Sequence, residues 1–128
     1  LSAFCDKVKC GVSLSWMTAM EGYEGNNDSD LSMRIQPMRD YLDFGDIAKF
    51  LAPKPMLFLN GASDHLFPKE LVQIAFDKMK AHYEAYEKVS GIPSAKYLVT
   101  EFFDGGHHCG KNEQATIVSF FRKYLSQQ

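Results

Sequence analysis

Two residue types that act together in hydrolytic sites, an aspartate and a histidine, each occur in a glycine-containing turn of this chain. Asp64 lies in the turn of residues 60–68, directly after the apolar run of residues 56–59. His107 lies in a glycine-rich loop after the hydrophobic segment 96–103. A carboxylate that accepts the Nδ1 proton of an imidazole fixes its tautomer, and the other nitrogen can then take a proton from a hydroxyl nucleophile. The pair therefore indicates an acid and a general base, while for Asp64 alone the capping of a helix or the closing of a turn is an equal alternative.

Both turns are expected at one edge of a parallel sheet. Three segments have the apolar pattern of strands: residues 8–15, 56–60 and 96–103. Three more have the apolar spacing or the boundary residues of helices: residues 46–51, 69–89 and the segment around 117–125. Strands that alternate with helices predict an α/β fold, with a parallel sheet, flanking helices and right-handed crossovers. One crossover helix separates Asp64 from His107, so their side chains can meet beyond the carboxyl ends of neighbouring strands.

Composition narrows the classes of function. The 128 residues make one domain or a piece of one, and the net charge of -2 provides no basic face for nucleic acid. No apolar run is long enough to span a bilayer, so no membrane span is expected. Three cysteines without C-x-x-C spacing argue against a full disulfide framework but leave one pair open. The chain opens with Leu1 in the middle of a pattern, which suggests a mature product or a piece of a longer chain.

A long irregular segment, residues 16–46, follows the first predicted strand. A connection of this length inside a compact domain is usually functional or disordered. Trp16 and Met17 lie at the carboxyl end of that strand, and we therefore predict that they line a substrate pocket. For the rest of the segment, pocket lining and a surface loop that packs its own apolar residues remain equal alternatives.

A serine nucleophile is harder to find. Residues 11–15 resemble a G-x-S-x-G elbow around Ser13, but the last glycine is replaced and the bulky Trp16 and Met17 follow. An elbow needs small residues around the serine and a helix directly after it. We therefore predict that Ser13 is a strand residue, and the chain offers no better candidate.

The motifs together resemble a known family. Residues 43–48, 52–61 and 64–68 look like the C-terminal part of an α/β-hydrolase, closest to the dienelactone-hydrolase-like and acetyl-xylan-esterase-like enzymes. Residues 103–109 resemble the histidine loop of that family, and the likeness spans nearly the whole chain. The resemblance implies that residues 1–128 are the C-terminal portion of a single α/β-hydrolase fold. It also implies that the nucleophile elbow and the oxyanion amides lie before Leu1.

Two neighbouring histidines compete for the catalytic role. The family pattern places the catalytic histidine after the glycine turn, before one variable and one apolar residue, which fits His107 better than His108. Asp104 is a rival acid, but it is too near in sequence to reach around the imidazole and is expected to shape the turn. His65 and His82 are expected to be an exposed loop residue and a helix-surface residue.

A metal site is the other chemical interpretation of these residues. Candidate ligands are His65, His107, His108 and Cys109. Sequence neighbours rarely chelate one ion together, and the usual paired-ligand spacings are absent. We therefore expect no metal and no cofactor.

The resemblance implies a serine-type carboxylic-ester hydrolase, with Asp64 and His107 as the acid and the base of a triad. It suggests acetyl or other short acyl esters, including esters on carbohydrate, as substrates. The expected partners are such an ester and the N-terminal remainder of the hydrolase domain, without which the chain should be inactive. A non-catalytic hydrolase-fold module that binds a ligand or a partner, or an inactive fragment, is the alternative.

Overall fold

A parallel three-stranded sheet is the centre of the structure, a computed structural model that describes residues 2, 5–19, 40–93 and 97–126. The strands are β1 (Gly11–Leu14), β2 (Met56–Gly61) and β3 (Leu98–Phe103), in the order β1-β2-β3. Both pairs are parallel, as the alternation of elements predicts. The first strand begins at Gly11 rather than at residue 8, which shortens the predicted element.

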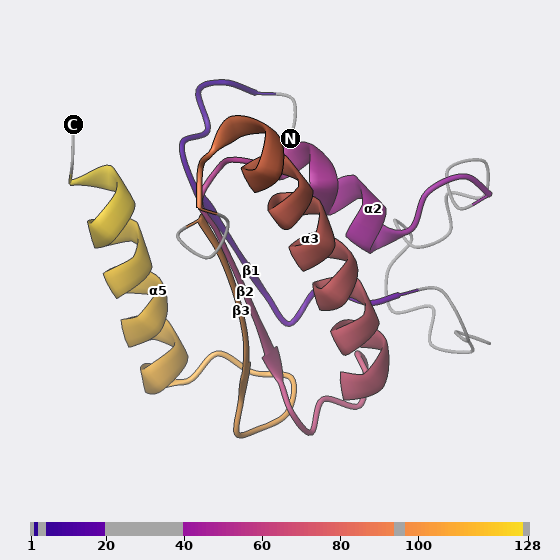
Figure 1. Cartoon of the computed structure of the whole chain (residues 1–128). Coiled ribbons are helices and arrows are strands. Elements are labelled where there is room, and N and C mark those ends of the chain that lie inside the picture. Colours follow the sequence, from indigo (N-terminus) through magenta and orange to yellow (C-terminus); the bar gives the residue numbers. More distant parts are fainter. Residues whose placement is uncertain (1, 3–4, 20–39, 94–96, 127–128) are drawn as a thin grey trace.

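Helices cover both faces of this sheet. Figure 1 shows α3 (Lys69–Ser90) and α2 (Phe44–Ala48) on one face and α5 (Lys111–Leu125) on the other. Alternate side chains of β2 serve the two faces: Met56 and Phe58 pack with the α2 and α3 side. Leu57 and Leu59 pack with the α5 side. Every residue of β2 is buried, as expected for a central parallel strand with a continuous apolar run.

The short helix before β2 begins earlier than the sequence predicted. Asp43 is its N-cap: the Asp43 carboxylate accepts from the amide of Phe44 at 2.7 Å, and the amide of Asp43 donates to Asp46 Oδ2 at 3.0 Å. Asp46 therefore lies inside the first turn and closes a capping box instead of starting the helix. The segment continues as η2 (Lys49–Leu51) before the chain turns into β2.

Helix α3 ends at Ser90, directly before Gly91, as the sequence predicts. Gly91 adopts the left-handed conformation at φ 71°, and its amide donates to the carbonyl of Glu87. Most of the irregular segment, residues 20–39, lies outside the described residues, as does much of the predicted helical tail at residues 1–5. Among the residues that the structure describes, no helix is both long and apolar enough to cross a bilayer.

Candidate active site

Asp64 lies in the turn that follows β2, with its side chain fully removed from solvent. Its Oδ1 accepts from the backbone amides of Leu66 at 2.9 Å and Phe67 at 3.2 Å. One carboxylate oxygen therefore closes the turn, which is the structural alternative considered for Asp64 in the sequence analysis. The other oxygen, Oδ2, remains for a different partner.

That partner is His107. Its Nδ1 lies 3.0 Å from Asp64 Oδ2, so the hydrogen bond expected between the two predicted residues is present. A carboxylate can only accept, so the proton of a neutral ring resides on Nδ1 and Nε2 carries the free lone pair. The ring stacks on Phe67 with 5.9 Å between centroids and is 47% exposed. Within the described part of the chain, no hydrogen bond engages Nε2, so this atom is placed to exchange a proton with a reactant.

Backbone contacts hold the two loops against one another. The amide of Ala62 donates to the carbonyl of Phe103, and the amide of Ser63 donates to that of Gly105, both at 2.9 Å. These bonds extend the pairing of β2 and β3 beyond the strands themselves. A Cβ on Gly61 would lie 2.3 Å from the carbonyl oxygen of Gly106, so only glycine allows this approach. The Asp64–His107 distance thus depends on a rigid frame of two strand ends.

His108 points toward a different carboxylate. Its Nε2 lies 3.7 Å from Glu113 Oε2, on the first turn of α5. Glu113 Oε2 also accepts from the amide of Gly110 at 2.7 Å and thereby caps the helix. Asp104 is exposed in the turn, and in the described residues it forms no hydrogen bond or ion pair with the ring of His107 or His108. The structure therefore places His107, and not His108, beside the buried acid.

The remaining histidines lie outside this arrangement. His65 is exposed in the loop next to Asp64, as expected. His82 is half-buried on α3, where burial, and then the positive charge of Lys49, lower its pKa below the ordinary value. In the described residues, no three side chains of the His, Cys, Asp or Glu type gather around a point that could hold a metal ion. The alternative of a metal centre therefore has no geometric support in this part of the chain.

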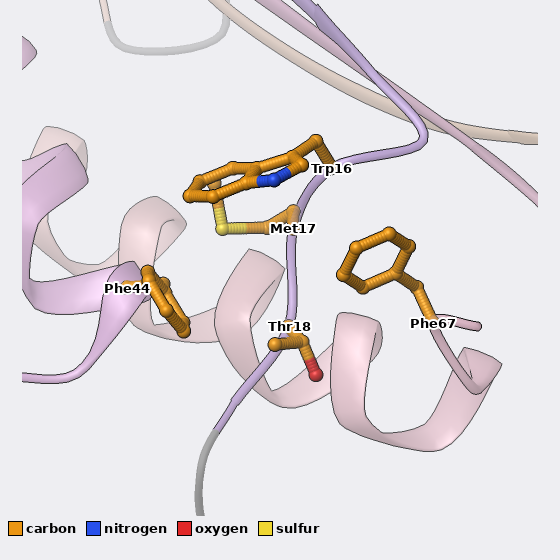
Figure 2. A pocket seen from close by; sticks show the side chains of 5 residues that line it. All are labelled: Trp16, Met17, Thr18, Phe44 and Phe67. Carbon is orange, nitrogen blue, oxygen red and sulfur yellow. The ribbon is translucent and has the colours of Figure 1, made fainter. Parts of the chain in front are cut away.

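A shallow apolar depression lies next to the loop that carries Asp64. It encloses no room for a water molecule, and it is lined by Trp16, Met17, Thr18, Phe44 and Phe67. Figure 2 shows the Trp16 ring over Met17, with Phe44 and Phe67 at the sides. Both residues predicted to line a pocket are thus in its wall, Met17 buried and Trp16 37% exposed. Because Phe67 also stacks on His107, the depression adjoins the imidazole.

Some residues near the Asp64–His107 pair were not identified from the sequence. Phe44 and Phe67 enter the depression through tertiary packing, which no local pattern indicates. Glu113 follows Gly110 by three residues, a spacing typical of a capping box, and this signal could have found it. Ser13 lies in β1, as predicted, and its hydroxyl donates to the carbonyl of Trp16 at 3.1 Å.

A parallel sheet covered on both faces, with an acid loop and a histidine loop at its carboxyl edge, is the C-terminal part of an α/β-hydrolase fold. Solved structures with this fold include a carbohydrate esterase family 15 glucuronoyl esterase from Caldicellulosiruptor kristjansonii, at 15% identity and a TM-score of 0.73. The match covers 99% of this chain and 39% of that one.

Two other solved structures are similar over shorter stretches. The methylesterase BT1017 matches with 17% identity and a TM-score of 0.52, over 64% of this chain and 17% of that one. TT1662 from Thermus thermophilus matches with 16% identity and a TM-score of 0.57, over 77% of this chain and 37% of that one. The chain thus spans less than two fifths of each of the three proteins. No protein-family model and no curated protein matches the sequence, so the likeness is one of fold.

Proposed function

We propose that this chain supplies the acid and the general base of a serine-type carboxylic-ester hydrolase. The observation that supports the proposal is the hydrogen bond between the buried Asp64 carboxylate and Nδ1 of His107. It leaves Nε2 as the proton acceptor that a hydroxyl nucleophile requires. Two of the proteins that share the fold are esterases by name, which is consistent with ester hydrolysis.

The proposed reaction begins when Nε2 of His107 takes the proton of a serine hydroxyl and the serine oxygen attacks the ester carbonyl carbon. The tetrahedral intermediate then collapses, the bond to the alcohol oxygen breaks, and His107 returns its proton to the leaving alcohol. Water repeats the sequence on the acyl-enzyme and releases the carboxylic acid. Asp64 keeps the Nδ1 proton in place and stabilises the imidazolium that forms in each half-reaction. We place the serine and the oxyanion amides in a part of the domain before Leu1.

The surroundings of His107 favour an ester with a small group on one side. The adjoining depression is apolar and so shallow that it encloses no room even for a water molecule. We propose that its surface flanks a short acyl or alkyl group, with Trp16 and Met17 as contacts. We propose acetyl or other short acyl esters, including those on carbohydrate. A glucuronoyl ester and a methyl ester, suggested by the names of two structural relatives, are the compounds to compare them with.

The test uses a form of the protein that includes the residues preceding this chain. We expect it to hydrolyse p-nitrophenyl acetate, to lose activity to a serine-directed phosphonate, and to carry that label on a serine outside residues 1–128. His107→Ala should lower the turnover by several orders of magnitude, because the members of a triad act as a unit. Retention of turnover in His107→Ala, or labelling of Ser13, would contradict the proposal. A folded protein without ester turnover would favour the binding module instead.

A further inference from the structure

The ring of His108 lies beside the loop that carries His107. A Cβ on Gly105, whose φ is 153°, would lie 2.2 Å from His108 Cε1. A Cβ on Gly110 would lie 3.5 Å from His108 Cδ2. The ring also meets Phe103 edge-on, with 5.2 Å between centroids. The imidazole therefore packs closely against Phe103 and Gly105 and lies near Gly110.

Packing, rather than charge, dominates the contacts of this ring. The distance of 3.7 Å from His108 Nε2 to Glu113 Oε2 is too long for a hydrogen bond. The His108 side chain is 47% exposed, and ion pairs in such surroundings contribute little. The same Glu113 oxygen is already engaged by the amide of Gly110. The close approach of the ring to Gly105 is the stronger contact.

Two backbone hydrogen bonds hold the glycines that precede His107. The amide of Ser63 donates to the carbonyl of Gly105 at 2.9 Å, on the Asp64 side. The amide of His108 donates to the carbonyl of Gly106 at 3.0 Å, on the α5 side. The backbone of His107 lies between these anchors, in a segment whose glycines impose little conformational restriction of their own.

We propose that His108 is a positioning residue whose ring acts as a steric wedge and holds His107 within hydrogen-bonding distance of Asp64. The inference rests on the proposed function for its catalytic meaning, but the predicted geometry can be measured separately. A small displacement of a catalytic base lowers the chemical step without changing substrate binding. The wedge therefore affects kcat and leaves KM unchanged.

Three variants separate the shape of the ring from its charge. His108→Ala removes the ring, His108→Phe keeps a flat ring of similar width without nitrogen atoms, and Glu113→Gln keeps the cap on Gly110 while removing the charge. In a form of the protein that hydrolyses p-nitrophenyl acetate, we expect His108→Ala to lower kcat about tenfold, with KM changed less than twofold. We expect His108→Phe and Glu113→Gln to stay within about threefold of the wild type.

The second measurement requires no turnover. Long-range ¹H–¹⁵N spectra of the imidazole rings report which nitrogen of His107 carries the proton. We expect Nδ1–H in the wild type, in His108→Phe and in Glu113→Gln, and a mixture of both tautomers in His108→Ala. If the protein proves to hydrolyse no ester, this spectrum still decides whether the wedge exists.

Several results would overturn the inference. These are an unchanged His107 tautomer in His108→Ala, a kcat of His108→Ala within twofold of the wild type, or a His108→Phe variant that behaves like His108→Ala. If His108→Ala does not fold, His108→Phe decides alone: a folded variant with Nδ1–H on His107 supports the wedge, and one with mixed tautomers refutes it.

Discussion

Replacement of Asp64 by asparagine separates the two tasks of this carboxylate. The Oδ1 atom accepts two backbone amides, and an asparagine oxygen can accept both of them as well. The Oδ2 atom faces Nδ1 of His107 at 3.0 Å, and an asparagine places an NH₂ group there instead. Because that group can only donate, it favours a bare Nδ1 and moves the ring proton to Nε2. Asp64→Asn should therefore preserve the turn but leave His107 in a tautomer that cannot act as the proposed general base.

The magnitudes follow from these contacts. A hydrogen bond to a charged group contributes about 1.5–3 kcal/mol, so Asp64 favours the Nδ1–H tautomer of His107 by about 10- to 100-fold. In Asp64→Asn the imidazole has the wrong tautomer for a general base, and loss of turnover by about 10⁴-fold is expected from comparable triads. The free energy of unfolding should change by less than ~1 kcal/mol, because the amides of Leu66 and Phe67 keep their acceptor.

Asp64→Ala is the matched comparison. It removes the acceptor of both amides, and that of Phe67 is buried, so the free energy of unfolding should fall by about 1–3 kcal/mol. Urea denaturation of the two variants, imidazole ¹H–¹⁵N spectra and p-nitrophenyl acetate turnover together give the test. An Asp64→Asn variant that retains Nδ1–H on His107, or that loses less than tenfold in turnover, would refute the assignment of Asp64 as the acid. Equal destabilisation by Asn and Ala would refute the account of the turn.

Gly61→Ala should lower the free energy of unfolding by about 1–3 kcal/mol, because the new Cβ would lie 2.3 Å from the carbonyl oxygen of Gly106. In Gly106→Ala the new Cβ has only one contact, at 3.6 Å, and the loss in the same urea titration should be less than ~1 kcal/mol. Burial raises the pKa of Tyr83, so the folded chain keeps this phenol protonated at a pH where the unfolded chain ionises it. The free energy of unfolding should therefore fall above about pH 10, and Tyr83→Phe should remove that part of the pH dependence. The free edge of β1 in the described sheet predicts that residues 1–128 alone associate and bind a hydrophobic dye, which light scattering and fluorescence measure. Hydrolysis of p-nitrophenyl acetate by that chain should not exceed the rate of its His107→Ala variant, and a monomeric chain with robust turnover would contradict this expectation.

The elements that the sequence predicts well are those whose signal is local. The continuous apolar run of β2 and the three- or four-residue spacing along α3 each determine an element within one segment. The contact between Asp64 and His107 then follows from topology, because the turns that follow neighbouring parallel strands lie at the same edge of the sheet. Neither residue alone predicted a catalytic site, but the positions of both at the ends of neighbouring strands predicted that their side chains lie close together.

The features that sequence could not predict depend on register and on distant packing. The need for glycine at position 61 appears only when β2 and β3 are paired, with Gly61 opposite Phe103, so that the histidine loop crosses the backbone. The walls of the depression come from three separate segments, which bring Phe44 and Phe67 to Trp16. The start of α2 was misplaced because two aspartates can serve as its cap, and only the geometry of Asp43 decides between them.

The two interpretations of Asp64, a turn-closing residue and a catalytic acid, are complementary in this fold. The bonds on Oδ1 close the turn and fix the plane of the carboxylate, and Oδ2 then faces His107, as the proposed catalytic role requires. In the histidine loop, His107 contacts Asp64 and His108 packs closely against Gly105. Since a base must keep its orientation while it gains and loses a proton, a neighbour that holds its loop should also affect turnover, although far less than the carboxylate does. Under the proposed function His107 is the reactive ring and His108 the supporting ring, and replacement of each by alanine tests this assignment.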